Sequence, residues 1–234
     1  MNHSIIDQYK WLEDRHLWFS LNQVKKINEY GSIWQFLRII SPGELYDLSL
    51  VATKHPDIDF FNNAFCPSQI KSKLWLIKEL NRTFESRFWP KSRIFIGCAW
   101  YNLLSYLLIK HADFWIENIS GEDIDPETIQ ISKSLLRDCI SIHNGDIFDC
   151  KYHLFDLIIN TSCEHIDFQK WLKLIPHGKI VALQSNNYSA LDEHINCCDS
   201  LEEFTDKCNL PKVYSCGVAK FTDKYDRYMV IGMK

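Results

Sequence analysis

The sequence predicts an α/β fold with a mostly parallel sheet and a C-terminal antiparallel hairpin, preceded by a helical N-terminal segment. After Pro90, short apolar runs alternate with amphipathic stretches, the pattern of β-α repeats in a parallel sheet. The last two apolar runs are joined without a helix, which predicts an antiparallel pair. Before residue 90, apolar residues recur every three or four positions, which predicts helices. We therefore expect a helical cap at 1–90 and an α/β core at 91–234.

The expected elements follow one another in a regular order. A helix is predicted over "PSQIKSKLWLIKELNRTF", because Ser68 after Pro67 suits a helix start. Pro126 suits the first turn of another helix, and Ser200 with Glu203 forms a capping pattern for "SLEEFTDKC". Strands are predicted at 93–98, 114–122, 139–143, 155–160 and 178–185, helices at about 101–111, 126–137 and 167–175, and the hairpin strands in "KVYSCGVAKF" and "DRYMVIGM".

The composition excludes several classes of protein. The chain has 234 residues, of which 46% are hydrophobic, so it can bury a sizeable core. Its net charge of −4, without a long basic run, argues against nucleic acid as a partner. No apolar run approaches the ~20 residues of a membrane span, and the start does not resemble a signal peptide, so we expect a cytoplasmic protein without membrane contact. Nine cysteines at irregular spacings favour reduced thiols.

The turn after the first predicted strand is the first candidate for a ligand site. In "RIFIGCAWYN" a buried strand runs through a turn into a helix, which is where α/β sheets bind nucleotide-like cofactors. The turn holds a single glycine, Gly97, whereas dinucleotide-binding turns use two or three. A pyrophosphate is therefore a poor match for this turn.

Polar side chains also follow the next three strands. Asp123 lies about 25 residues beyond Gly97, near the spacing of acids that bind ribose hydroxyls. Asp146 follows the third strand, and the fourth strand ends in "NTSCEHI". Because the carboxyl ends of parallel strands share one edge of the sheet, these groups are expected to line one crevice. The alternative is that Asp123 and Asp146 only cap helices or turns, and Asp125 is expected to cap the helix at Pro126.

Residues 91–234 resemble the class I S-adenosylmethionine-dependent methyltransferases. The resemblance rests on five segments taken together: "IFIGCAWYN", "GEDIDPETIQISK", "NGDIFD", "FDLIINTSCEHI" and "LIPHGKIVAL". It implies a Rossmann-like core, a transferase activity and S-adenosylmethionine as cofactor. The sequence departs from the family at Ala99 and Tyr101, where the family has its second and third glycines.

The resemblance also implies residues that bind the cofactor. Gly97, Cys98 and Ala99 would face its methionine part. Trp100 or Tyr101 would offer an aromatic face to the sulfonium or ammonium, since cations near aromatic rings are stabilised; alternatively both rings pack on the N-terminal helices.

The remaining parts of the cofactor are assigned to the next strand ends. Asp123 would bind the ribose hydroxyls, with Ile124 on the adenine, and Asp146 and Ile147 would hold the adenine edge. The segment that would border the sulfonium comprises Asn160, Thr161 and Ser162.

The candidate acid and base groups are Glu164, His165 and His194, since histidine titrates near neutrality. The alternative for Glu164 and His165 is a structural role. His194, Cys197 and Cys198 invite a metal hypothesis, but zinc needs three or four convergent ligands and no second pair accompanies them. We therefore expect no metal at this cluster, and instead a loop that contacts substrate or caps a helix.

The expected activity is methyl transfer to a small-molecule acceptor. The fourth strand lacks the Asn/Asp-Pro-Pro-aromatic motif of enzymes that methylate amino groups of bases and glutamine. One alternative is transfer of an aminopropyl or aminocarboxypropyl group from a related sulfonium compound that binds in the same pocket. Another is a catalytically silent, cofactor-binding regulatory subunit, which the irregular first turn would favour.

Overall fold

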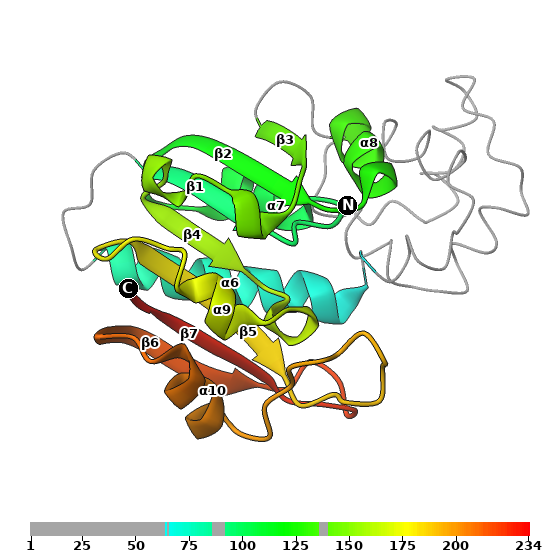
Figure 1. Ribbon diagram of the computed structural model, residues 1–234, viewed down its shortest axis with the longest axis vertical. Helices are drawn as coiled ribbons and strands as arrows, with labels where there is room; N and C mark the ends of the chain where they lie inside the picture. The colour runs from blue at the N-terminus through cyan, green and yellow to red at the C-terminus, as the bar shows by residue number, and fades with distance from the viewer. Residues whose placement is uncertain (1–63, 65, 86–91, 136–139) are drawn as a thin grey trace, which may run out of the picture. The chain divides into compact units, whose positions relative to one another are not determined.

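The chain divides into two compact units, Met1–Pro67 and Ser68–Lys234. The computed structural model describes residue 64 and residues 66–85, 92–135 and 140–234 (Figure 1). Most of the predicted N-terminal helices lie outside the described residues, and the division of the chain at residue 90 stays a prediction.

The second unit contains a seven-stranded sheet in the order β3-β2-β1-β4-β5-β7-β6 (Figure 1). Strands β1 to β5 are parallel, and β7 runs antiparallel to both β5 and β6. The predicted fold, a mostly parallel sheet that ends in an antiparallel hairpin, is confirmed. The strands are β1 (Ser92–Gly97), β2 (Ile116–Asp123), β3 (Ile140–Asn144), β4 (Leu157–Asn160), β5 (Ile180–Asn186), β6 (Lys212–Ala219) and β7 (Arg227–Met233).

Burial along the strands explains their apolar sequences. Every residue of β4 and β5 is buried, since both lie inside the sheet and are covered on both faces. The edge strand β6 instead alternates between half-buried and exposed positions over much of its length. Strand position in the sheet therefore accounts for the difference between a continuous apolar run and an alternating one.

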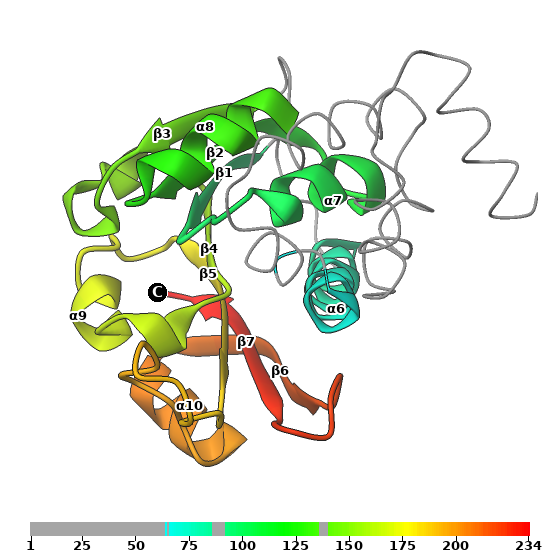
Figure 2. The same cartoon turned by 90° about the vertical axis from the view of Figure 1, so that its right-hand side faces the viewer.

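Helices cover both faces of the sheet. In Figure 2, α6 and α7 lie on one side of the sheet, and α9 and α10 lie on the other. The helix α9 ends earlier than predicted, because the N–H groups of the next three residues bond to carbonyls three positions back and tighten the chain into a turn. The helices are α6 (Pro67–Glu85), α7 (Leu103–His111), α8 (Pro126–Leu135), α9 (Phe168–Leu172) and α10 (Leu201–Cys208), with short 3-10 turns η1 (Ile147–Asp149), η2 (Tyr152–Leu154) and η3 (Cys163–His165).

Helix α6 is attached to the sheet through a buried polar pair. The Ser72 hydroxyl donates to Oε1 of Gln184 at 3.0 Å, and Nε2 of Gln184 donates to the Ser72 carbonyl at 3.2 Å. Gln184 belongs to the buried strand β5, where an amide side chain needs such partners. This helix therefore packs with the α/β core, although its sequence period is that of the N-terminal segment.

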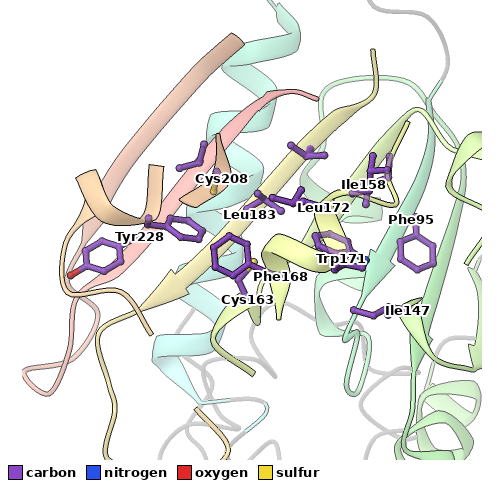
Figure 3. Close-up of a cluster of buried hydrophobic side chains, with 14 of the residues drawn as sticks. Phe95, Ile147, Ile158, Cys163, Phe168, Trp171, Leu172, Leu183, Cys208 and Tyr228 are labelled. Atoms are coloured by element: carbon purple, nitrogen blue, oxygen red, sulfur yellow. The ribbon is translucent and has the colours of Figure 1, made fainter. Parts of the chain in front are cut away.

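A cluster of buried side chains lies between the sheet and α9 and α10 (Figure 3). Phe95, Phe168 and Trp171 belong to it, and each is at most 1% exposed. The indole of Trp171 donates to the Tyr152 hydroxyl at 2.6 Å, which in turn donates to the Ile147 carbonyl. This core holds the chain after β3 against β1, and so positions one wall of the candidate site.

At the opposite, amino-terminal edge of the sheet, Asp156 forms a bidentate pair with Arg93, at 3.0 Å and 3.1 Å. The hydrogen bonds from Arg93 lower the pKa of Asp156 below its ordinary value. The resulting stabilisation is present above the unfolded-state pKa and is lost as the pH falls through the folded-state pKa.

We expect Asp156→Asn to lower the free energy of unfolding by ~1 kcal/mol at pH 7. The difference from the unchanged protein should shrink below about pH 4, where the carboxylate is protonated in both states. Urea unfolding at several pH values measures this, and a difference independent of pH would contradict it.

None of the helices within the described ranges has the length and apolarity needed to cross a bilayer.

Candidate functional site

The candidate site lies at the edge of the sheet where β1 to β5 end. Strand β1 has β2 on one side and β4 on the other, so the order of the parallel strands reverses between β1 and β4. In open α/β sheets, ligands bind at this reversal, outside the carboxyl ends of the strands. All predicted site residues except His194 lie in or directly after β1, β2, β3 or β4.

In the turn after β1, every second residue has a left-handed backbone conformation. Cys98 and Trp100 have φ of 50°, and Asn102 has φ of 56°. Such a conformation costs about 1–2 kcal/mol for most residues and less for asparagine. Ala99 and Tyr101, which stand where the resemblance places glycines, lie between these positions and do not adopt it. The positive φ angles of the turn therefore do not fall at Ala99 and Tyr101, the two positions where the family has glycine.

The carboxylate of Asp123 holds this turn. Its Oδ2 accepts the backbone N–H of Trp100 at 2.7 Å, and its Oδ1 accepts the N–H of Asp125 at 3.1 Å. The N–H of Ala99 donates to the Glu122 carbonyl at 3.1 Å. A carboxylate offers about four acceptor positions, so two remain after these backbone bonds. Asp123 both fastens the strained turn to β2 and keeps capacity to accept two hydroxyls.

The side chain of Asn102 lies directly over Gly121 in β2. A Cβ built on Gly121 would stand 2.0 Å from Oδ1 of Asn102. Oδ1 also accepts the Ser105 hydroxyl at 3.2 Å. A glycine is thus required at position 121 because the end of the turn crosses β2 at this point.

We expect Gly121→Ala to destabilise the protein by roughly 1–3 kcal/mol, the usual cost of overpacking. Combining it with Asn102→Gly, which removes the obstructing side chain and tolerates a positive φ, should recover part of this loss. Thermal unfolding of both variants measures the effect; equal destabilisation in the two would mean that the contact with Asn102 is not the cause.

The predicted adenine-binding residues lie after β2 and β3. Ile124 is 72% exposed, which is unusual for a large apolar side chain and leaves it open to a planar ligand. Asp146 is exposed and caps η1 by accepting the N–H of Phe148 at 2.9 Å. The side chain of Ile147 is buried beside Gly97. Asp125 accepts the N–H of Glu127 at 2.9 Å, so its predicted capping role is confirmed.

The turns after β1 and β4 touch each other through two of the predicted residues. Asn160, which is fully buried, donates from Nδ2 to Sγ of Cys98 at 3.8 Å and accepts the N–H of Ser162 at 2.8 Å. Burial, with a contribution from the negative charge of Asp123, raises the pKa of Cys98 to about 12. Cys98 is therefore a neutral thiol and not a nucleophile at physiological pH.

The aromatic residues of the first turn differ in exposure. The side chain of Tyr101 is 1% exposed, whereas Trp100 is half-buried. Their ring centroids are 5.5 Å apart. The carbonyl of Trp100 accepts the Ser132 hydroxyl of α8 at 3.2 Å.

Glu164 is held in a buried polar cluster that was not predicted from the sequence. Its Oε1 accepts Nδ2 of Asn186 and lies 3.8 Å from Nη1 of Arg227. The same Arg227 nitrogen donates to the Thr161 carbonyl at 3.2 Å. The signal in the sequence is the arginine that precedes the apolar run of β7, since a charge at a buried position requires a partner. These contacts support a positioning role for Glu164.

The structure brings the three predicted acid and base residues together. A carboxylate oxygen of Glu164 and one ring nitrogen each of His165 and His194 lie within 4.8 Å of one another. The two imidazole rings meet edge to face, with centroids 4.5 Å apart. Partial burial lowers the pKa of His165, with the Glu164 charge acting in the opposite direction. The surroundings therefore favour the neutral form of His165.

The two cysteines that follow His194 separate from each other. Cys198 is buried in the hydrophobic core, while Sγ of Cys197 lies 3.8 Å from Nδ1 of His194. Burial raises the pKa of Cys197, which keeps it a thiol. The side chains of His194, Cys197 and Cys198 therefore do not converge on one point, as a metal site built from all three would require.

The chain is similar to known proteins in structure but matches none of them by sequence. No family model and no curated protein matches the chain. The N-methyltransferase NodS from Bradyrhizobium japonicum WM9, in complex with S-adenosyl-L-homocysteine, is similar with a TM-score of 0.56 at 14% identity, over 80% of this chain and 98% of NodS. The fold is that of the class I methyltransferases. Magnesium protoporphyrin IX methyltransferase (ChlM) from Synechocystis PCC 6803, with bound S-adenosylhomocysteine, gives a TM-score of 0.55 at 10% identity, over 82% and 94% of the two chains.

A protein with another activity shares this fold. The [4+2]-cyclase SpnF is similar with a TM-score of 0.51 at 8% identity, over 68% of this chain and 80% of SpnF. The methyltransferase fold therefore does not by itself determine the reaction, and the chemistry has to be argued from the site.

Proposed function

We propose that this protein is an S-adenosylmethionine-dependent methyltransferase that acts on a small-molecule acceptor. The observation that carries the proposal is the carboxylate of Asp123 at the end of β2, which holds the turn after β1 and retains two acceptor positions. The structural neighbours NodS and ChlM were solved with S-adenosylhomocysteine, which supports the same cofactor here.

In this proposal the cofactor lies across the ends of β1, β2 and β3. Asp123 accepts both ribose hydroxyls, and the exposed Ile124 covers one face of the adenine. Burying an isoleucine of this exposure stabilises the complex by up to ~2 kcal/mol. Asp146 would accept a hydrogen bond from the exocyclic amine, and Asp146 and Ile147 together would hold the adenine edge. The methionine part lies along Gly97, Cys98 and Ala99, beside Trp100 and Tyr101.

The reacting methyl would then lie near Asn160, Thr161 and Ser162, next to the pair of histidines. Methyl transfer needs the acceptor atom in line with the carbon–sulfur bond, and much of the rate comes from that alignment. Where the acceptor loses a proton, Glu164, His165 and His194 are the candidate bases, because their donor atoms lie within 4.8 Å of one another beside this edge of the sheet.

Calorimetric titration of the full chain with S-adenosylmethionine and S-adenosylhomocysteine, with NAD as control, tests the cofactor assignment. Binding of both sulfur compounds and none of NAD supports the proposal, and absence of binding to all three contradicts it. Product analysis with a panel of small acceptors tests the reaction, because methyl transfer releases S-adenosylhomocysteine, whereas aminopropyl and aminocarboxypropyl transfer release methylthioadenosine.

A further inference from the structure

Three groups with the chemistry of metal ligands converge beside the end of β4. Glu164 and His165 come from η3, directly after β4, and His194 comes from the loop after β5. Their candidate donor atoms lie within 4.8 Å of one another. A carboxylate with two imidazoles is the donor set of many catalytic zinc sites, in which three protein ligands leave a further position for water or substrate.

One oxygen of Glu164 is left for such a role. Asn186 and Arg227 both approach Oε1. Oε2 is buried and has no hydrogen-bond partner among the described residues. Glu164 as a whole is only 2% exposed. An unsatisfied buried carboxylate oxygen costs free energy unless another group binds it. A cation bound between Oε2 and the imidazoles would satisfy it.

His194 is oriented as metal-bound histidines are. Its Nδ1 lies in hydrogen-bond contact with the Tyr188 carbonyl, which can only accept, so Nδ1 carries the proton in the neutral ring. The lone pair is then on Nε2, free to bind a metal. A backbone carbonyl on the non-ligating nitrogen is the usual outer contact of a metal-bound imidazole.

The loop that carries His194 is fastened to the η3 turn. The N–H of Asn196 donates to the Glu164 carbonyl at 3.0 Å, and Nδ2 of Asn196 donates to the Ile166 carbonyl at 3.2 Å. The N–H of Cys198 donates to the Asn186 carbonyl at 3.2 Å. These bonds hold the backbone of the loop, and with it His194, beside η3 and the end of β5.

We propose that Glu164, His165 and His194 form a zinc-binding site with an open position that faces the acceptor side of the crevice. Metal–ligand bonds of about 2.0–2.2 Å require donor atoms closer than 4.8 Å. The imidazole of His165, the most exposed of the three side chains, can rotate to close this distance. Neutral imidazoles favour zinc over magnesium, which prefers oxygen ligands.

The test titrates the chelator-treated full chain with ZnCl2 in a calorimeter, with MgCl2 as the comparison ion and without any cofactor. We expect one zinc ion per chain and no magnesium. His165→Gln and His194→Gln should each weaken zinc binding more than about tenfold, while His177→Gln, an exposed histidine in the turn before β5, should leave it unchanged. Circular dichroism without metal checks that each variant is folded.

Two results would overturn the proposal. One is the absence of stoichiometric zinc binding by the unchanged chain. The other is that His165→Gln and His194→Gln both bind zinc as tightly as the unchanged chain does. A Cys197→Ser variant addresses the neighbouring thiol; retained binding there supports the proposed set, and lost binding there with retained binding in His165→Gln overturns it. Because the titration contains no S-adenosylmethionine, its outcome does not depend on the proposed methyl transfer, which the cofactor titration tests separately.

Discussion

Arg227→Met is expected to lower the free energy of unfolding by ~3–5 kcal/mol, the usual cost of removing one partner of a buried ion pair. The substitution leaves the buried carboxylate of Glu164 without its cation, while the hydrogen bond from Asn186 stays. It also removes the donor to the Thr161 carbonyl. Urea unfolding followed by tryptophan fluorescence measures the change, since Trp171 is fully buried in the hydrophobic core.

The double variant Glu164→Gln with Arg227→Met separates the charge from the loss of packing. Without the buried carboxylate, more than half of the lost stability should return. The matched control is Lys220→Met, which removes a cation of the same hairpin that is 68% exposed and 3.4 Å from Asp226. It should change stability by less than about 0.5 kcal/mol. Equal effects of Arg227→Met and Lys220→Met would contradict the account of Glu164 as a buried, arginine-held group.

Asp123→Asn is expected to weaken S-adenosylhomocysteine binding roughly 10- to 100-fold, since hydrogen bonds to a charged group contribute about 1.5–3 kcal/mol. The amide removes the charge and replaces one acceptor oxygen by a donor. That nitrogen faces either the N–H of Trp100 or the hydroxyls of the ligand. Calorimetric titration measures the affinity. Asp123→Ala should weaken binding further, because it also releases the strained turn.

Asp125→Asn provides the control for this prediction. Asp125 lies two residues further along and caps α8 through the N–H of Glu127. Asparagine caps helices as well as aspartate does, so fold and affinity should both stay near those of the unchanged protein. If Asp123→Asn bound the ligand as tightly as Asp125→Asn does, the ribose assignment would have to be abandoned.

Most of the second unit could be predicted because its signals are local. The continuous apolar runs of β4 and β5 and the missing helix between β6 and β7 predicted a parallel sheet with an antiparallel end. Turn chemistry at Pro126 and Ser200 placed two helix starts. The end of α9 was predicted too late, because the turns that close it depend on backbone hydrogen bonds and not on side-chain period.

The candidate site was predictable in part for the same reason. Asp123 ends β2 and Asp146 lies just after β3, and the shared edge of a parallel sheet brings strand ends together. The double use of Asp123, as support for the turn and as a candidate ribose ligand, was not predictable, because it depends on the left-handed residues of the turn after β1.

The sequence by itself determined the order of strands and helices along the chain and the residues at each strand end. Both follow from periodicity and turn chemistry within continuous segments. Only the tertiary structure decided that Arg227 lies beside Glu164 and that His194 lies beside His165. These pairs come from segments that meet through the pairing of β5 with β7 and through the loop fastened to η3. Contacts of this kind leave no period in the sequence, because they depend on where separate elements pack and not on the spacing of residues within one element.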